Sequence, residues 1–203
     1  MKRLLFLSAA FLLAGCVNLD IAKDKSPAVV YYVLDAPAAP VVTPPPPDPR
    51  ILLVADTTTT AFYDGDALVF SRSPGTRGQY QFARWTERPG KRFADLLRAR
   101  LQPQFAATTA AGGYVQGDLL LDTELTEFYH DADTEPGSVR VVLRAELIDL
   151  KQRKLLAQHT FEQRVALTRY DAAAAAQGFN QATAAMLDDA AAWLAAQKSP
   201  AQP

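Results

Sequence analysis

The chain has a single cysteine, Cys16, among its 203 residues. One cysteine cannot form an intramolecular disulfide, so the fold has to be held together by its hydrophobic core. Hydrophobic residues make up 49% of the chain, which is enough for a substantial core. The length is that of one domain of ordinary size. Composition therefore predicts a single domain that is stabilised by packing and not by covalent cross-links.

The first sixteen residues have the layout of a secretory signal peptide. Lys2 and Arg3 form a basic start, residues 4–13 are apolar, and the string Leu-Ala-Gly-Cys ends at Cys16. The apolar stretch is shorter than the roughly 20 residues that a membrane-spanning helix needs. Leu-Ala-Gly-Cys resembles the lipobox of bacterial lipoproteins, which implies S-diacylglycerol and N-acyl groups (including palmitate) on Cys16 and cleavage after residue 15. The alternative is a free thiol after an ordinary signal peptide.

Residue 17 bears on where the acylated chain ends up. In lipoproteins of Gram-negative bacteria, an Asp after the acylated cysteine commonly retains the protein at the inner membrane, and this chain has Val17 there. We therefore expect Cys16 to anchor the protein in outer-membrane lipid, with the domain facing the periplasm. Each buried methylene contributes about 0.8 kcal/mol, so three acyl chains would make the anchor effectively permanent.

The charge balance argues against a nucleic-acid partner. The chain has 21 Lys and Arg residues against 22 Asp and Glu residues, a formal net charge of −1. Proteins that bind nucleic acids need a basic excess to neutralise phosphates. We therefore expect no nucleic acid among the partners.

The composition along the chain divides it into four parts. Residues 1–15 are the predicted signal peptide and 16–26 a short lipidated tether. Residues 27–198 form the predicted domain, and 199–203 a frayed tail. The proline-rich segment 36–49 is either a spacer before the domain or a loop between two strands. We favour the loop, because residues 31–34 (YYVL) are too apolar for a free tether.

Hydrophobic periodicity predicts an α+β fold with a mostly antiparallel sheet and two helices packed on one of its faces. Apolar residues spaced as on one helical face predict helices from Pro89 to about residue 105, with Pro103 bending or ending the helix early, and from about Asp171 to the tail. Alternating apolar and polar residues over 119–131, 139–147 and 155–167 predict an antiparallel meander with one wet face. Shorter apolar runs predict further strands at 28–34, 51–54, 68–70 and 80–85.

The motifs that carry catalytic or metal chemistry are missing from the sequence. His130 precedes Asp131 and Asp133, but alternation along an extended segment would point these side chains to different faces, so a solvated loop is the favoured interpretation. His159 is expected at an exposed strand position. The segment 74–78 has glycines but no Gly-Lys-Ser/Thr ending, and no serine lies in a Gly-x-Ser-x-Gly string. We therefore expect no enzyme activity, no metal and no cofactor.

One segment combines aromatic residues with arginines before the first helix. Residues 79–89 (QYQFARWTERP) contain Trp85 between Arg84 and Arg88. Aromatic residues and arginine are enriched at binding hot spots, so Arg84 and Arg88 are a candidate partner surface. The simpler interpretation, which we favour, is that Trp85 fills the junction between strand and helix while both arginines are solvated.

Several of these features, in this order, resemble the ABC-type transport auxiliary lipoprotein family of the paraquat-inducible intermembrane-transport type. They are the lipobox at Cys16, the strand at residues 31–34 and the string 83–89 (ARWTERP) leading into a helix. The resemblance implies an auxiliary component, at the outer membrane, of an ABC transporter and a mammalian-cell-entry (MCE) domain protein. Such systems move lipids or other hydrophobic molecules between membranes. The resemblance also allows a homo-oligomer.

Three functional hypotheses follow. The first is a docking component that couples the MCE protein to the outer membrane. The second is a lipid carrier whose own domain encloses an acyl chain in an apolar cavity. The third is a scaffold for another envelope complex. A well-packed core would favour the first hypothesis, and an apolar cavity between sheet and helices would favour the second.

Overall fold

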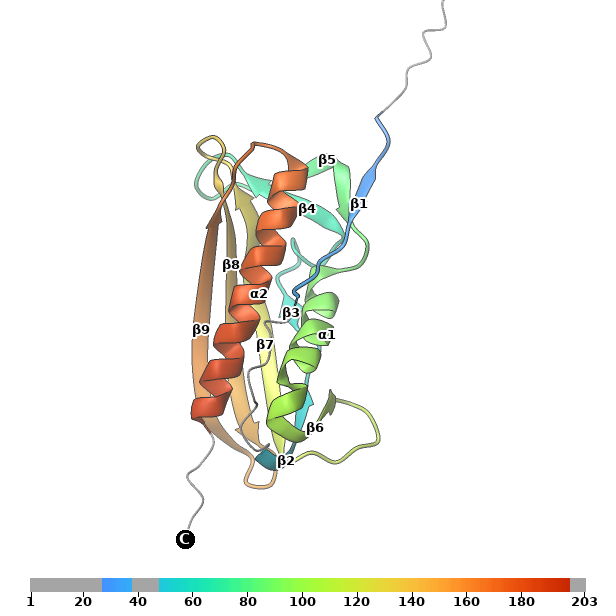
Figure 1. Ribbon diagram of the computed structural model, residues 1–203, viewed down its shortest axis with the longest axis vertical. Coiled ribbons are helices and arrows are strands. Elements are labelled where there is room, and N and C mark those ends of the chain that lie inside the picture. Colours follow the sequence, from blue (N-terminus) through green and yellow to red (C-terminus); the bar gives the residue numbers. More distant parts are fainter. Residues whose placement is uncertain (1–26, 38–47, 198–203) are drawn as a thin grey trace, which may run out of the picture.

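The computed structural model describes residues 27–37 and 48–197. The predicted signal peptide, Cys16, the tether up to residue 26, positions 38–47 of the proline-rich loop and the tail from residue 198 lie outside the described residues. The elements in chain order (Figure 1) are β1 (Val30–Tyr32), β2 (Asp48–Val54), β3 (Thr58–Thr59), β4 (Ala67–Ser71), β5 (Gly78–Trp85), α1 (Pro89–Leu101), the 3-10 turn η1 (Gln102–Gln104), β6 (Phe105–Ala110), β7 (Leu119–Asp131), β8 (Ser138–Asp149), β9 (Lys154–Ala166) and α2 (Ala172–Ala196).

Strand β7 organises the sheet, because nearly every other strand is placed relative to it. Along one edge it pairs with β8, which in turn pairs with β9. Along the other edge β2, β3 and β4 follow one another, each parallel to β7. A strand of 13 residues is about 43 Å long, so it can hold three short strands end to end. The outer positions are taken by β6 beside β2 and by β5 and β1 beside β4.

The prediction of a mostly antiparallel sheet was wrong. In the described residues the strands form one curled, mixed sheet, in which only β4–β5, β7–β8 and β8–β9 pair antiparallel. The pairs β1–β5, β2–β6, β2–β7, β3–β7 and β4–β7 are all parallel. A parallel pair needs a crossover connection, and a strand's own residues do not record which distant strand it will meet. The sequence pattern detected the antiparallel meander β7–β8–β9 and missed the parallel half.

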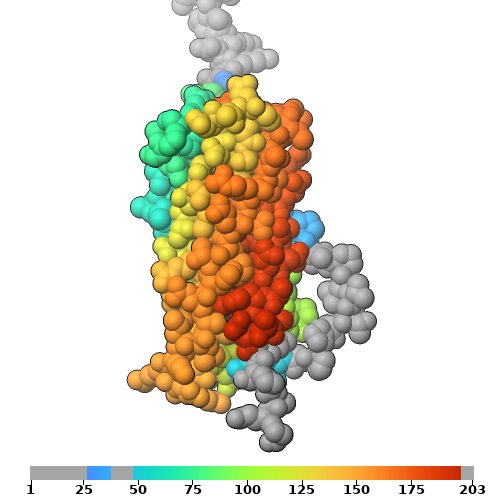
Figure 2. Space-filling model, turned by 90° about the vertical axis from the view of Figure 1, so that its left-hand side faces the viewer, coloured from blue at the N-terminus to red at the C-terminus, as the bar shows by residue number. Residues whose placement is uncertain are grey.

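Both helices lie on the same face of the sheet (Figure 1). Helix α2 packs against β8 and β9. Helix α2 and strand β9 run side by side along the molecule (Figure 2). Helix α1 contacts α2, β2, β3 and β6. Gly178 of α2 lies so close to the sheet that an added Cβ would stand 2.6 Å from Leu167 Cδ2 and 3.0 Å from Val139 Cγ2. The small residue therefore permits the close approach of α2 to β8.

The helix boundaries follow from local chemistry. Pro89 begins α1, where its missing N–H costs nothing and its fixed φ suits the first turn. The helix ends at Leu101, and Pro103 lies in the short 3-10 turn that follows. Phe105 thus begins strand β6, whereas periodicity had placed it on the helix. Helix α2 begins after Asp171, whose Oδ1 accepts a hydrogen bond from the N–H of Ala174 at 2.7 Å.

The segment after β1 is held by both helices. Leu34 is buried in the core, and its carbonyl oxygen accepts a hydrogen bond from Arg92 Nε of α1 at 2.9 Å. Asn180 of α2 donates to the Val33 carbonyl oxygen at 3.3 Å and accepts from the N–H of Asp35 at 3.1 Å. The chain that leaves β1 is therefore part of the packed domain and not a free linker.

Candidate functional site

Arg84 and Arg88, the candidate partner residues, flank the junction between β5 and α1. Arg84 Nη1 donates to the carbonyl oxygens of Tyr80 at 2.7 Å and of Ala83 at 2.9 Å. Arg84 Nε also lies 3.9 Å from Asp66 Oδ1. The guanidinium is thus partly committed to the backbone of its own strand.

Arg88 has a different environment. Its side chain is 66% exposed, and its ion pair with Asp64 spans 3.8 Å between Nη1 and Oδ1. An exposed pair of this length contributes little to folding. The environments of the two arginines therefore differ, because Arg84 supports β5 while Arg88 is exposed and weakly paired.

The indole of Trp85 lies between the two arginines in sequence but points into the core. It is 1% exposed, and its ring centroid lies 5.9 Å from that of Phe128 and 5.5 Å from that of Phe179. Phe128 and Phe179 stack on each other at 4.3 Å. The prediction that Trp85 fills the junction between strand and helix is confirmed.

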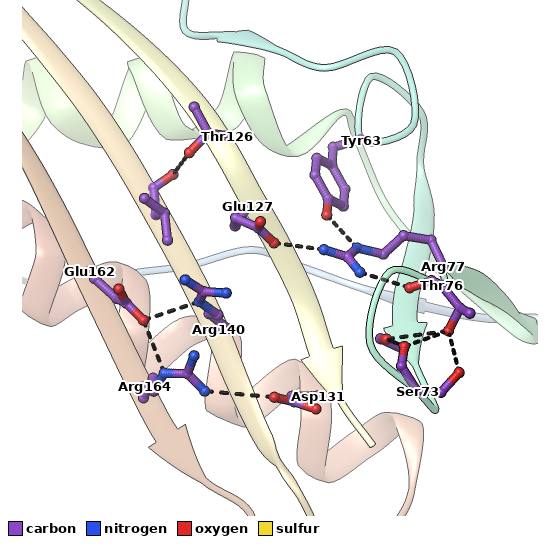
Figure 3. Close-up of polar contacts among 12 residues, drawn as sticks. Tyr63, Ser73, Thr76, Arg77, Thr126, Glu127, Asp131, Arg140, Glu162 and Arg164 are labelled. Carbon is purple, nitrogen blue, oxygen red and sulfur yellow. Dashed lines mark hydrogen bonds and ion pairs between the residues drawn. The ribbon is translucent and has the colours of Figure 1, made fainter. Parts of the chain in front are cut away.

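A network of charged side chains covers the face of the sheet opposite the helices (Figure 3). Arg77, in the loop before β5, reaches onto β7. Its Nη2 donates to Glu127 Oε2 at 2.7 Å, and its Nε donates to the Tyr63 hydroxyl at 2.7 Å. The Arg77 guanidinium also lies 3.8 Å from the centre of the Tyr129 ring. Arg77 therefore fastens the β4–β5 loop to the middle of the sheet.

The second half of this network joins β7, β8 and β9. Arg140 and Arg164 lie directly opposite each other on β8 and β9, an unfavourable placement for like charges. Glu162 Oε1 accepts from Arg164 Nε at 2.9 Å and from Arg140 Nε at 3.0 Å, and so bridges the two. These two arginines, Arg164 first, hold the pKa of Glu162 below its usual range. Asp131 adds a contact of 3.6 Å to Arg164.

Most residues of this network, though not Tyr63 or Glu162, line a groove of about 400 Å³. Its charged lining residues are Arg77, Arg140, Arg164, Glu127, Asp131 and Asp133. Equal numbers of positive and negative side chains give no net field to attract an anion, and the arginines are tied to carboxylates at hydrogen-bond distance. We interpret the groove as a polar surface whose paired charges stabilise the sheet, and not as an anion-binding site. The sequence shows its charged residues, but the cross-strand register that brings them together was needed to find it.

The prediction of a solvated loop at His130 was wrong. His130 is fully buried at the end of β7, where its Nε2–H donates to the Pro136 carbonyl oxygen at 3.0 Å and its Nδ1 accepts from the Tyr80 hydroxyl at 2.7 Å. Burial lowers the pKa of His130 and raises that of Tyr80 to about 12, so both are neutral at pH 7. Strand β7 ends at Asp131, as the alternation over 119–131 predicted, and β4 and β8 pair with its last residues, so His130 lies within the sheet and not in a loop. His130 thus ties β5 to the β7–β8 turn.

The remaining features bear on metal binding and membrane insertion. His159 is exposed on β9, as predicted, and stacks near Trp193 at 6.2 Å. Within residues 27–37 and 48–197, no three His, Cys, Asp or Glu side chains are grouped so that they could hold a metal ion. In the same part of the chain, neither helix combines the length and the apolar character required to cross a bilayer.

The fold is shared with proteins of known structure. Protein XCC0632 from Xanthomonas campestris superimposes with a TM-score of 0.75 at 20% sequence identity, over 83% of this chain and 96% of that one. A second, uncharacterized protein superimposes with a TM-score of 0.65 at 18% identity, over 82% of this chain and 99% of that one. The protein is therefore a two-layer domain of this type, with one curled mixed sheet beneath two helices. A search among curated proteins found no match.

The family is established by the sequence. The model of the ABC-type transport auxiliary lipoprotein component matches residues 32–191, which include all of the sheet from β2 onwards and most of α2. The chain belongs to this lipoprotein family.

Proposed function

We propose that this protein is an outer-membrane lipoprotein that faces the periplasm and serves as the docking component of an ABC transporter with an MCE-domain protein. The anchoring half of this proposal, acylation of Cys16, is supported by the Leu-Ala-Gly-Cys string, because this string ends a signal-peptide pattern. Membership of the transport auxiliary lipoprotein family supports the transporter half. The cargo class is lipids or other hydrophobic molecules that move between membranes.

The packing between sheet and helices supports docking over lipid carriage. Trp85, Phe128 and Phe179 meet there with ring centroids 4.3–5.9 Å apart. Leu97, Leu143 and Leu187 are each fully buried. An enclosed acyl chain would have to displace these side chains from a closely packed interior. A carrier would release stoichiometric lipid on solvent extraction of the unacylated chain, and we expect none.

Arg88 is the residue that we assign to the partner surface, with Arg84 beside it. Arg88 is exposed and weakly paired, so a carboxylate of a partner can replace Asp64 as its contact. Arg84 contributes mainly by holding the end of β5 in place.

Co-purification tests this assignment. The chain is purified with a C-terminal tag from native membranes in mild detergent, and co-purifying proteins are identified by mass spectrometry. We expect an ATPase, a permease and an MCE-domain protein with the unsubstituted chain, and a reduced yield of all three with Arg88→Glu. Lys91→Glu, a neighbouring exposed charge reversal, is the matched control. Recovery of a different envelope assembly would replace the docking role by that of a scaffold.

A further inference from the structure

Exposed apolar side chains gather on and around β1. Val29, Val30, Tyr31 and Val33 are 43%, 48%, 61% and 54% exposed. Register in the parallel β1–β5 pair places Tyr31 beside Arg84 and Tyr32 beside Trp85. Because Trp85 points into the core, Tyr31 and Arg84 are on the outward side of this pair.

Alternation extends this outward side along both strands. Val29 and Val33, which flank β1, share it with Tyr31, and Phe82, 37% exposed, shares it with Arg84 on β5. We call this set of five residues, Val29, Tyr31, Val33, Phe82 and Arg84, the β1 face. It is an apolar surface with one polar aromatic and one cation, the composition that side chains take at a membrane–water interface.

The charges around the β1 face cancel. Arg84 lies 3.9 Å from Asp66, and nearby Arg88 lies 3.8 Å from Asp64. Two arginines against two aspartates leave no basic excess with which to attract anionic lipid. Contact with a bilayer would therefore depend on apolar burial and would be insensitive to salt.

The chain itself connects this face to the predicted anchor. Residues 17–28 separate Cys16 from Val29, a span of at most about 45 Å when fully extended. The β1 end is therefore the described part of the chain nearest to Cys16 in sequence, and this tether keeps it within reach of the bilayer.

We propose that the β1 face rests on the membrane that holds Cys16, with its apolar side chains at the boundary between headgroups and acyl chains. This inference depends on the anchoring half of the proposed function. Strand addition by a partner peptide fits β1 less well, because β1 has only three residues and can offer few backbone hydrogen bonds. The partly hydrated headgroup region leaves the free edge of this short strand in contact with water.

The single cysteine allows a test that does not depend on acylation in cells. A chain of residues 16–203 keeps every residue of the hydrophobic core, which extends from Leu34 to Leu194. Cys16 of this chain is coupled to a maleimide-headgroup lipid in vesicles of phosphatidylethanolamine and phosphatidylglycerol with brominated acyl chains. Tyr31→Trp places a fluorophore on the β1 face, and the unsubstituted chain supplies the background from its native tryptophans. Tyr114→Trp, at a fully exposed tyrosine in the loop between β6 and β7, is the matched control.

We expect the added fluorescence of Tyr31→Trp to be quenched and blue-shifted on brominated vesicles, equally at about 0.05 M and about 0.5 M salt. Tyr114→Trp should be unaffected. Val29→Ser with Val33→Ser in the Tyr31→Trp chain should lower the partitioning of the uncoupled protein by roughly three- to tenfold, from the loss of apolar area. Equal quenching of both reporters, or of neither, would overturn the inference. So would a blue shift that depends on protein concentration without lipid, because a second copy would then cover the face.

Mass spectrometry of the protein from native membranes reports separately on the anchor. An unacylated Cys16 together with quenching of Tyr31→Trp on maleimide vesicles would refute the proposed anchoring and leave the membrane affinity of the β1 face intact. An acylated Cys16 without quenching would refute the β1 face alone.

Discussion

Truncation of Trp85 is the most informative single change in this chain. Trp85 is 1% exposed and contacts the rings of Phe128 and Phe179, so Trp85→Ala opens a cavity at the point where β5, β7 and α2 meet. Truncations of this kind cost about 3–5 kcal/mol of the free energy of unfolding. For a domain of this size, each kcal/mol corresponds to about 2–4 °C, so we expect the melting temperature to fall by about 6–20 °C.

Urea denaturation followed by far-UV circular dichroism measures this loss without relying on tryptophan fluorescence. Trp85→Phe is the matched conservative variant, and it should cost less than Trp85→Ala because it leaves a smaller cavity. The indole Nε1 of Trp85 has no hydrogen-bond partner among the described residues, so the substitution by phenylalanine removes no hydrogen bond. Trp193→Ala, at the half-buried second tryptophan, should cost less than Trp85→Ala. A Trp85→Ala protein of unchanged stability that fails to capture its partners would refute the reasoning and make Trp85 a binding residue.

Changes at four further residues test single interactions by the same urea titration. Burial lowers the pKa of His130 in the folded protein, so the unfolded chain binds this proton at a higher pH than the folded chain does. The contribution of neutral His130 to stability is therefore complete above about pH 6.5, the ordinary pKa of histidine, and is lost as the pH falls towards the folded-state pKa. His130→Gln should flatten this dependence, and an already flat profile in the unsubstituted chain would contradict it. Asp171→Ala should cost about 1 kcal/mol by removing the N-cap of α2, whereas Asp171→Asn should restore most of it. Arg88→Ala should change the free energy of unfolding by less than about 0.5 kcal/mol. Arg84→Ala should lower it by about 0.5–1.5 kcal/mol, because two hydrogen bonds are lost. Equal costs would contradict the different roles assigned to the two arginines.

Local patterns in the sequence were sufficient for the elements whose contacts are near in the chain. The start of α1 at Pro89 and of α2 after Asp171 depends on capping within one turn. The meander of β7, β8 and β9 depends on alternation and on two short connections. The burial of Trp85 followed from the same alternation, read at the end of β5.

The tertiary structure decided what depends on distant pairing. That β2, β3 and β4 all run parallel to β7 is set by crossovers, and no local pattern encodes it. The neighbouring Asp131 and Asp133 predicted a solvated loop at His130. Because the end of β7 pairs with β4 and β8, His130 is instead buried against Tyr80.

The sequence by itself determined the Leu-Ala-Gly-Cys string, the lack of an intramolecular disulfide and the approximate positions of both helices, because these depend on residue identity and short-range spacing. Only the tertiary structure decided the mixed sheet, the charged groove on its open face and the outward side of the β1–β5 pair. Each of these requires strands that are far apart in the chain to meet in one register, and a change of one residue in that register would turn every side chain to the opposite face.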